Sequence, residues 1–276
     1  MRCDASDQRS SGRTPNTLTS APRNVGRVQK KRGRRVLKVI LWGVVGVLVI
    51  GIVGILAWSQ IGVMSAEKDP LASVEDNSAI HVEDTEQGIV LTPADGESDL
   101  GLVFVPGAKV DPWAYAPILQ SLAEEGVTVV ITRPWLNLAF FDLRGLDSFT
   151  SAAPDIDDWA VGGHSLGGVR ACQLAADAEA LVLFGSYCAT DVSDTDLAVL
   201  SISGSEDGLS TPEKIADARD LLPADAEMVE IEGASHASFG DYGPQAGDGE
   251  PTISSDEMHA QVSEILDAFM ADVAAR

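Results

Sequence analysis

The residues Gly163-His164-Ser165-Leu166-Gly167 place a serine between two glycines at a fixed spacing. A strand-like run, Trp159 to Gly162, precedes this motif, and a helical run, Val169 to Ala176, follows it. A serine on a sharp turn from strand to helix adopts a strained backbone conformation, and side chains two residues away would collide with neighbouring backbone. The same turn leaves a free N–H at a helix N-terminus, which favours negative charge. The motif therefore makes Ser165 a candidate nucleophile.

A serine hydroxyl is a weak nucleophile until a base removes its proton, so a histidine should lie near it. His236 and His259 are the histidines that follow Ser165, and a serine on this kind of turn has its base later in the chain. His236 lies in a loop of small residues after the strand-like run Met228 to Ile231, whereas His259 lies within a helical pattern. We therefore predict His236 as the base, and we interpret His164 as packing support around the site.

An acid should orient that histidine from the end of the preceding strand. The apolar run Ala198 to Ser203 predicts this strand, and Gly204-Ser205-Glu206-Asp207-Gly208 follows it as a turn. Asp207 is the predicted acid. Glu206 is the alternative, because either carboxylate is close enough along the chain to reach the imidazole.

Two backbone N–H groups should stabilise the negative charge that develops on a substrate oxygen, and losing one such donor typically costs ~10² to 10³ in rate. The residue after the nucleophile, Leu166, supplies the first predicted donor. The loop Val105-Pro106-Gly107-Ala108-Lys109 supplies the second. We predict the N–H of Ala108 for this oxyanion hole, with the backbone N–H of Lys109 as the alternative and its side chain directed at the mouth of the pocket.

Short apolar runs alternate with helical patterns beyond residue 80, which predicts an α/β fold with a mostly parallel central sheet and helices on both faces. Near-continuous apolar strands are typical of a sheet buried on both faces. The segment between the strand-like runs Leu181–Gly185 and Ala198–Ser203 is too short for a lid domain. The predicted strands are Gly88–Thr92, Leu100–Val105, Val127–Thr132, Trp159–Gly162, Leu181–Gly185, Ala198–Ser203 and Met228–Ile231, and the predicted helices are Pro112–Glu125, Leu136–Ser148, Gly167–Ala178, Thr211–Leu221 and Ser255–Ala275.

The two ends of the chain carry opposite charge. Residues 1–38 hold eleven Lys and Arg against two acids, whereas the remaining eight Lys and Arg face forty acids, a net charge of −32. Between these parts, Val39 to Ile61 holds no charged residue and has Trp42 and Trp58 near its ends. About 20 apolar residues span a bilayer as a helix, and tryptophans are enriched at membrane interfaces. We predict a single transmembrane signal-anchor helix at residues 36–61.

The basic residues before this helix predict its orientation, because Lys and Arg beside a membrane helix stay in the cytoplasm. Residues 1–35 are predicted to form a disordered basic cytoplasmic tail, since they hold few large apolar side chains. Residues 62–79 are predicted as a linker, and residues 80–276 as one α/β domain outside the cytoplasm at the cell membrane. A cleaved signal peptide is the alternative, although this apolar stretch exceeds the ~7 to 15 residues of a usual signal-peptide core.

Cys172 and Cys188 would then lie in an oxidising compartment, where a disulfide persists, while Cys3 stays reduced in the tail. The sequence leaves open whether Cys172 and Cys188 form a disulfide or are two small buried side chains.

Six stretches follow one another through nearly all of residues 80–275, namely FVPGAKVDPWAYAPILQSLAEEGV, RPWLNLAFFD, DDWAVGGHSLGG, LVLFGSYCATDVSD, LSISGSEDGLSTPEKI and IEGASHASFGDYGPQAGDGEPTIS. They resemble the α/β-hydrolase family, type 5, in its dienelactone-hydrolase-like branch. The resemblance implies an α/β-hydrolase fold with Ser165 as nucleophile, Asp207 as acid and His236 as base. The family usually has Asn before the catalytic histidine, whereas Ser235 stands there in this chain. For Phe239 to Gly243, which matches the family's Phe-Gly-x-Tyr-Gly, we assign only a packing role.

These features predict a membrane-anchored extracytoplasmic serine hydrolase that forms an acyl-enzyme on Ser165. Its predicted partners are a small-molecule ester or related acyl substrate and the lipid bilayer. The alternatives are an acyltransferase, amidase or peptidase on the same fold, and a catalytically silent surface module that binds a partner. The charge of −32 argues against nucleic acid as a partner. No metal-ligand spacing, Walker loop or G-x-G-x-x-G motif is found in the sequence, so no cofactor is predicted.

Overall fold

A computed structural model of the chain describes residues 25–96 and 99–276. Contacts divide the chain between Gly54 and Ile55 into two compact units. The first unit holds most of the predicted anchor. The second unit, Ile55–Arg276, holds the predicted linker together with the α/β domain.

The long helix α1 (Val25–Gln60) contains the predicted anchor. Its segment from Arg34 to Gln60 has a mean hydropathy of 2.9 in its most apolar window, where no residue is buried, so it is long and apolar enough to cross a membrane. Residues 25–35, which we predicted as part of a disordered tail, are helical here. The prediction of disorder rested on the scarcity of large apolar residues and did not weigh the high helix propensity of Lys, Arg and Gln as residue types. Residues 1–24 of the predicted tail lie outside the described residues.

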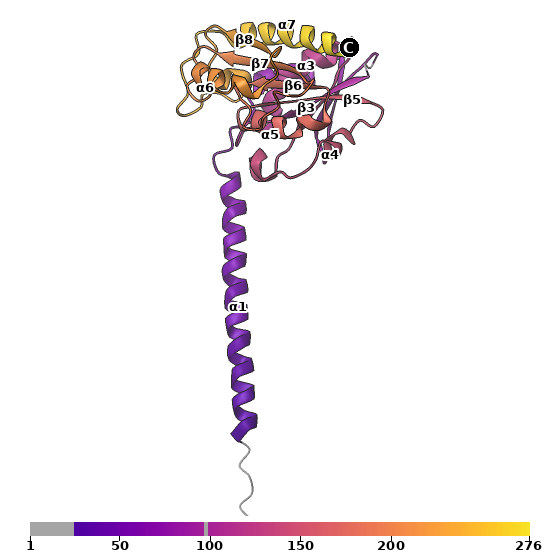
Figure 1. The fold of residues 1–276 in the computed structure, drawn as a ribbon. Coiled ribbons are helices and arrows are strands. Elements are labelled where there is room, and N and C mark those ends of the chain that lie inside the picture. The colour runs from indigo at the N-terminus through magenta and orange to yellow at the C-terminus, as the bar shows by residue number, and fades with distance from the viewer. Residues whose placement is uncertain (1–24, 97–98) are drawn as a thin grey trace, which may run out of the picture. The chain divides into compact units, whose positions relative to one another are not determined.

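The second unit is built on one sheet with the strand order β1-β2-β4-β3-β5-β6-β7-β8 (Figure 1). The pairs β1–β2 and β2–β4 are antiparallel, and the other pairs are parallel. This arrangement confirms the mostly parallel sheet, and each predicted strand is present with small shifts at its ends. The strands are β1 (Ile80–Asp84), β2 (Gly88–Pro93), β3 (Leu100–Val105), β4 (Thr128–Thr132), β5 (Asp158–His164), β6 (Ala180–Phe184), β7 (Ala198–Gly204) and β8 (Glu227–Ile231).

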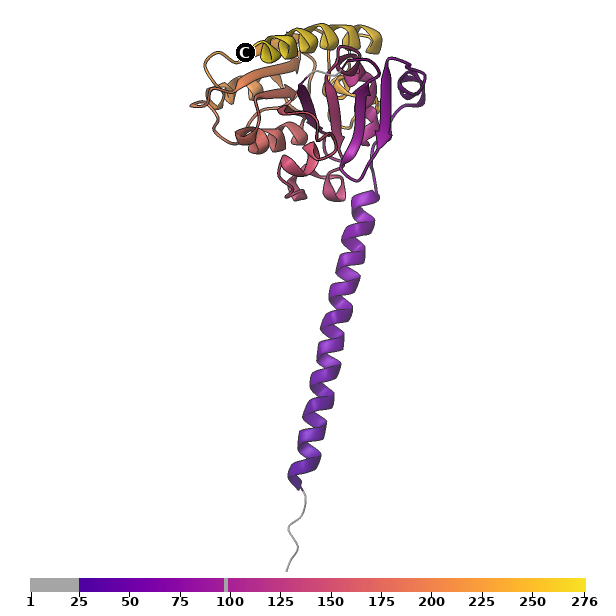
Figure 2. The same cartoon turned by 90° about the vertical axis from the view of Figure 1, so that its right-hand side faces the viewer.

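Strand β1 was not among the predicted strands. Its sequence, IHVED, is short and mostly polar, and only Ile80 is buried. It lies at one end of the sheet beside β2 (Figure 2). Ile80 pairs with Pro93. An edge strand needs to bury little of its surface, so its apolar signal in the sequence is weak.

Helices cover both faces of the sheet, as predicted. α3 (Ala116–Glu124) and α7 (Ser255–Ala274) pack on one face with η1 (Pro112–Tyr115), and α4 (Asp147–Thr150) and α5 (Leu166–Leu174) pack on the other (Figure 1). Successive residues of β3 alternate between the two cores, with Leu102 and Phe104 facing α3 and α7, and Val103 and Val105 facing α5. The remaining short elements are η4 (Ala175–Asp177), α6 (Pro212–Asp217), η5 (Arg219–Leu221) and η6 (His236–Phe239).

The helix predicted at Leu136–Ser148 is wrong. The structure has two short turns there, η2 (Trp135–Asn137) and η3 (Ala139–Phe141), before α4 begins at Asp147. Leu136 and Asn137 have φ values of 59° and 55°, which bend the chain in a direction that a right-handed helix does not allow. The Asp142 carboxylate also accepts hydrogen bonds from the backbone and guanidinium of Arg144, so local polar contacts replace a helical ladder.

The predicted linker, residues 62–79, is an ordered part of the second unit. It contains α2 (Lys68–Glu75), whose Val74 is buried in the core. The N–H of Met64 donates to the carbonyl of Lys109 at 2.7 Å, and the carbonyl of Met64 accepts from Asp111. The linker therefore packs along the loop that follows β3.

A disulfide joins Cys172 of α5 to Cys188, which follows β6, with 5.6 Å between the two Cα atoms. The question that the sequence left open is thus answered in favour of pairing. The connection from β6 to β7 contains neither helix nor strand, which agrees with the prediction that no lid domain is inserted there.

Candidate active site

Ser165 lies at the turn between β5 and α5, with φ 53° and ψ −123°. This conformation is costly for a residue with a side chain, and such strain is concentrated at functional sites. The turn is fixed by two hydrogen bonds, because Ser165 N–H donates to the Phe184 carbonyl at 3.1 Å and the Ser186 hydroxyl donates to the Ser165 carbonyl at 2.7 Å. A Cβ on Gly163 would lie 2.5 Å from the carbonyl carbon of Gly167. The two flanking glycines are therefore required by close backbone packing.

Asp207 and His236 are brought together by the ends of β7 and β8. Asp207 Oδ2 lies 2.7 Å from His236 Nδ1, and both side chains are buried. The other oxygen, Asp207 Oδ1, accepts from the backbone N–H groups of Leu209 and Ser210 at 2.8 and 2.7 Å. A carboxylate held in this way accepts from Nδ1–H and leaves Nε2 free to take a proton. His236 Nε2 has no hydrogen-bond partner among the described residues.

The alternative acid and base lie elsewhere. Glu206 is exposed, although it is the direct neighbour of the buried Asp207. His259, on α7, has its Nε2 3.0 Å from Asp241 Oδ2 and thereby forms a separate pair. The structure therefore favours Asp207 over Glu206 and His236 over His259.

The loop after β3 distinguishes between the two predicted oxyanion donors. Lys109 N–H donates to the Asn137 carbonyl at 2.8 Å and is occupied. The Lys109 ammonium donates to the carbonyls of Trp58 and Ile61 at 2.9 and 2.8 Å. The N–H groups of Ala108 and of Leu166, the first residue of α5, have no acceptor among the described residues. These two N–H groups are therefore the ones available to a substrate oxygen.

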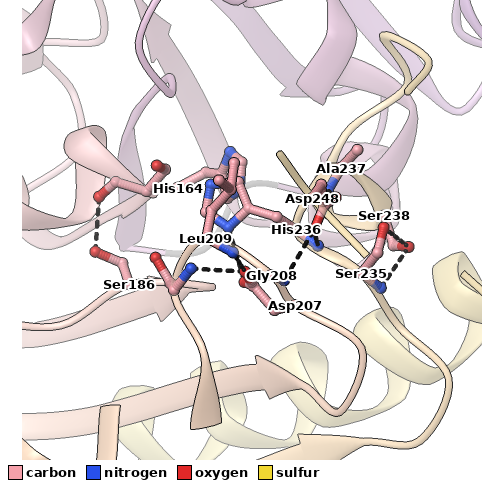
Figure 3. A network of polar contacts seen from close by, with 12 residues as sticks. His164, Ser186, Asp207, Gly208, Leu209, Ser235, His236, Ala237, Ser238 and Asp248 are labelled. Carbon is pink, nitrogen blue, oxygen red and sulfur yellow. Dashed lines mark hydrogen bonds and ion pairs between the residues drawn. The ribbon is translucent and has the colours of Figure 1, made fainter. Parts of the chain in front are cut away.

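His164 is buried beside the catalytic candidates, and its ring centroid lies 4.4 Å from that of His236 (Figure 3). Its Nδ1 lies 2.9 Å from the Tyr115 hydroxyl, which also accepts the N–H of Gly107 at 3.0 Å. Burial raises the pKa of Tyr115, so its O–H remains protonated and donates to His164 Nδ1. Burial, and then the nearby charge of His236, holds the pKa of His164 well below its ordinary value. A neutral His164 does not repel an imidazolium formed on His236.

Asp248 was not predicted, yet it holds the loops that carry the acid and the base (Figure 3). Its Oδ1 accepts from the N–H groups of Gly208, His236 and Gly249 at 3.1, 3.0 and 2.7 Å, and its Oδ2 accepts from Ala237 at 2.8 Å. Burial raises the pKa of Asp248, but these four hydrogen bonds outweigh burial and hold it below its ordinary value.

Ser235 and Phe239 support the histidine loop from its two ends. The N–H of Ser235 donates to the Ser238 hydroxyl at 3.0 Å and closes a capping box over η6, at the position where the family usually has Asn. Phe239 is fully buried, with its ring 5.8 Å from that of His164 and 5.6 Å from that of Phe184. The packing role expected for this stretch is thus observed for Phe239.

A cavity of about 350 Å³ borders the same loop. Ser235, Ala237 and Asp248 line it, but Ser165, Asp207 and His236 do not. We therefore do not identify this cavity with the binding site for an acyl group.

The chain matches the alpha/beta hydrolase family over residues 101–260, a range that includes Ser165, Asp207 and His236. No curated protein matches it. The family match does not distinguish the dienelactone-hydrolase-like branch. Because it covers more than half of the chain, and because the sheet and its covering helices have the expected arrangement, the chain belongs to the alpha/beta hydrolase family.

Proposed function

We propose that the protein is a membrane-anchored serine hydrolase with Ser165 as nucleophile, His236 as base and Asp207 as the acid that orients it. The buried hydrogen bond of 2.7 Å between Asp207 and His236 carries the proposal. A buried carboxylate is stable only when it is paired and hydrogen-bonded, and Asp207 has these partners in His236, Leu209 and Ser210. His236 Nε2, which has no hydrogen-bond partner among the described residues, is the nitrogen left to take a proton.

In the proposed reaction, His236 Nε2 takes the proton of the Ser165 hydroxyl as its oxygen attacks the substrate carbonyl. The resulting oxyanion accepts from the N–H groups of Ala108 and Leu166. The imidazolium then gives its proton to the leaving alcohol, and an acyl-enzyme remains on Ser165. Water, activated by the same histidine, attacks the acyl-enzyme and releases a carboxylic acid.

An ester is the proposed substrate class, because an alcohol leaves more readily than an amine and the site needs no cofactor for this chemistry. We further propose that α1 crosses the membrane with its basic end in the cytoplasm. The apolar segment Arg34–Gln60 supports the crossing, and the basic residues before it support the orientation. The Cys172–Cys188 disulfide supports an extracytoplasmic location for the second unit, since disulfides persist in oxidising compartments.

The proposal is tested with a fluorophosphonate probe that does not cross membranes, applied to intact cells that produce the full-length chain. We expect labelling of the wild type and none of Ser165→Ala. His236→Ala should slow labelling by about 10³ or more, because the serine loses its base. Labelling only after cell lysis would contradict the proposed orientation, and absence of labelling in lysed cells would contradict the proposed nucleophile.

A further inference from the structure

The large exposed hydrophobic side chains of the second unit beyond Ile61 gather in one place. Trp135, Phe140, Phe141 and Leu143 are 51, 72, 45 and 80 % exposed, and among the described residues after Ile61 only Met228 is comparable. All four belong to residues 134–143, which we call the apolar loop. The surface of a soluble domain rarely exposes such a cluster unless the cluster contacts a membrane or another apolar surface.

The apolar loop is bonded to the end of α1, through contacts that lie entirely within the second unit. The Asn137 side-chain amide donates to the Ser59 carbonyl at 3.1 Å. The Lys109 ammonium, whose own backbone N–H is held by Asn137, donates to the Trp58 and Ile61 carbonyls and lies 4.0 Å above the Trp58 ring. The loop is therefore one hydrogen bond away from the point where the apolar helix ends.

The basic residues of this acidic unit also gather around the apolar loop. Of the eight Lys and Arg after residue 38, Arg133 and Arg144 flank the loop, and Lys109 and Arg170 bond to it or to its flank. Residues 133–144 contain one acid, Asp142, which pairs with Arg144 at 2.6 Å. Arg133 likewise pairs with Asp84 at 2.6 Å, so the local excess of positive charge rests on Lys109 and Arg170, whereas the unit as a whole would be repelled by anionic lipid.

The apolar loop is also in contact with the predicted oxyanion hole. Its Asn137 carbonyl accepts the N–H of Lys109, next to Ala108, and η3 packs against α5, whose first residue is Leu166. A surface that contacts the loop thus lies close to the place where a substrate carbonyl would bind.

We propose that the apolar loop inserts into the lipid surface from which α1 emerges and that the serine site takes acyl esters of amphiphiles held in that surface. Aromatic side chains favour the interface between hydrocarbon and headgroups, and Lys109 and Arg170 supply positive charge that matches anionic headgroups. The inference depends on the proposed membrane anchoring and on the proposed serine chemistry.

The experiment uses the full-length chain in vesicles of phosphatidylcholine and phosphatidylglycerol. Cys3→Ser removes the free thiol, while Cys172 and Cys188 stay oxidised. Single cysteines for an environment-sensitive fluorophore are introduced as Leu143→Cys in the loop and, as a matched exposed control, Met228→Cys on β8. Val45→Cys in α1 reports separately on the anchor.

We expect lipids with a nitroxide on the acyl chain to quench the label at position 143 at least about three times as strongly as the label at position 228. Iodide, a quencher dissolved in water, should quench the label at position 228 more strongly than the label at position 143. Lipid quenching at 45 with water-like behaviour at 143 would overturn the inference and leave the anchor standing. Labels at positions 45 and 143 that both behave as in water would overturn the inference and also the proposed membrane anchor. A label at 143 shielded from iodide and from lipid would indicate a protein partner, such as a second copy, and would also overturn it.

The substrate part is tested with Phe140→Ser combined with Leu143→Ser. Hydrolysis of a long-chain ester in vesicles should fall roughly tenfold, while hydrolysis of a short water-soluble ester changes by less than about twofold. An equal fall with both esters would overturn the inferred substrate class. Absence of fluorophosphonate labelling of the wild type would instead count against the proposed serine chemistry itself.

Discussion

Replacement of Asp248 by asparagine tests whether the active site is held in place by this carboxylate. Asp248 contacts neither the substrate oxygen sites nor the side chains of Asp207 and His236, but its carboxylate accepts N–H groups from both of their loops. Asparagine has almost the same shape and retains one acceptor oxygen. Its NH₂ group, however, would face an N–H donor, so at least one of these contacts becomes repulsive.

The size of the effect follows from the hydrogen bonds that change. Bonds to a charged acceptor contribute about 1.5–3 kcal/mol each, but they are not additive, and water replaces some of them at this half-buried site. We expect the free energy of unfolding to fall by about 2–3 kcal/mol. Because a shift of about 1 Å in a catalytic group costs up to ~10²-fold, kcat should fall by roughly 10- to 100-fold with a smaller change in KM.

The assay compares ester hydrolysis by Asp248→Asn and Glu250→Gln at a temperature where melting curves show both variants to be folded. Glu250 is an exposed carboxylate in the same loop, so its replacement controls for the loss of one charge. A folded Asp248→Asn variant whose kcat lies within about twofold of that of Glu250→Gln would refute the positioning role of Asp248. Since its folded pKa lies below its ordinary value of 3.8, the wild-type contact should support stability above about pH 4 and be lost as the pH falls through the folded pKa.

Three further predictions concern stability and the support of the site. Tyr115→Phe leaves a buried N–H and a buried imidazole nitrogen without a hydrogen-bond partner, so it should lower the free energy of unfolding by about 2 kcal/mol. It should also lower kcat. A melting curve measures the loss of stability, and an ester assay measures the loss of kcat. Reduction of Cys172–Cys188, or replacement of both by alanine, should cost about 3 kcal/mol in denaturant unfolding, given a sequence separation of 16; equal midpoints with and without reductant would contradict this. Burial, followed by the charges of Glu125 and Glu124, raises the pKa of Asp267 from its ordinary value of 3.8 to about 6. The folded state therefore holds this proton more tightly than the unfolded state, and the protein loses stability as the pH rises from 3.8 to about 6. Asp267→Asn should therefore gain about 1 kcal/mol above pH 6, a value reduced for partial exposure, and nothing below about pH 4.

The parts of the fold that could be predicted from the sequence are those with a strong local signal. Strand β3 was predicted with its observed ends because its six residues are all buried and apolar. The turn at Ser165 was predicted because its glycine spacing lies between a strand-like run and a helical run, although the backbone that requires Gly167 belongs to Val105 and Pro106, where the distant strand β3 ends. Asp207 was preferred as the acid over Glu206, and burial agrees with that choice, but the reason is a long-range one: the turn directs Asp207 towards the end of β8.

The parts that were missed depend on contacts between distant segments. Residues 136–148 have helical spacing of apolar side chains, but the positive φ angles of Leu136 and Asn137 follow from bonds to Lys109 and Ser59, which no local pattern reveals. Asp248 lies in a turn-rich stretch among many acids, and only the folded structure shows that it bridges the loops that carry Asp207 and His236. A carboxylate between glycines was the only local signal of its role.

The loop after β3, which carries the proposed oxyanion donor Ala108, is held by hydrogen bonds from two sides, and this explains why the Ala108 N–H has no acceptor among the described residues. From the core side, Tyr115 accepts the N–H of Gly107; from the side of the apolar loop, Asn137 accepts the N–H of Lys109. Pro106 has no N–H, and the N–H of Val110 is used within the loop by the Gly107 carbonyl. Ala108 thus lies between two residues, Gly107 and Lys109, whose N–H groups are hydrogen-bonded, while its own N–H has no acceptor among the described residues. A donor that is already oriented needs no reorganisation when charge develops on the substrate, which is the condition under which an oxyanion hole accelerates a reaction most.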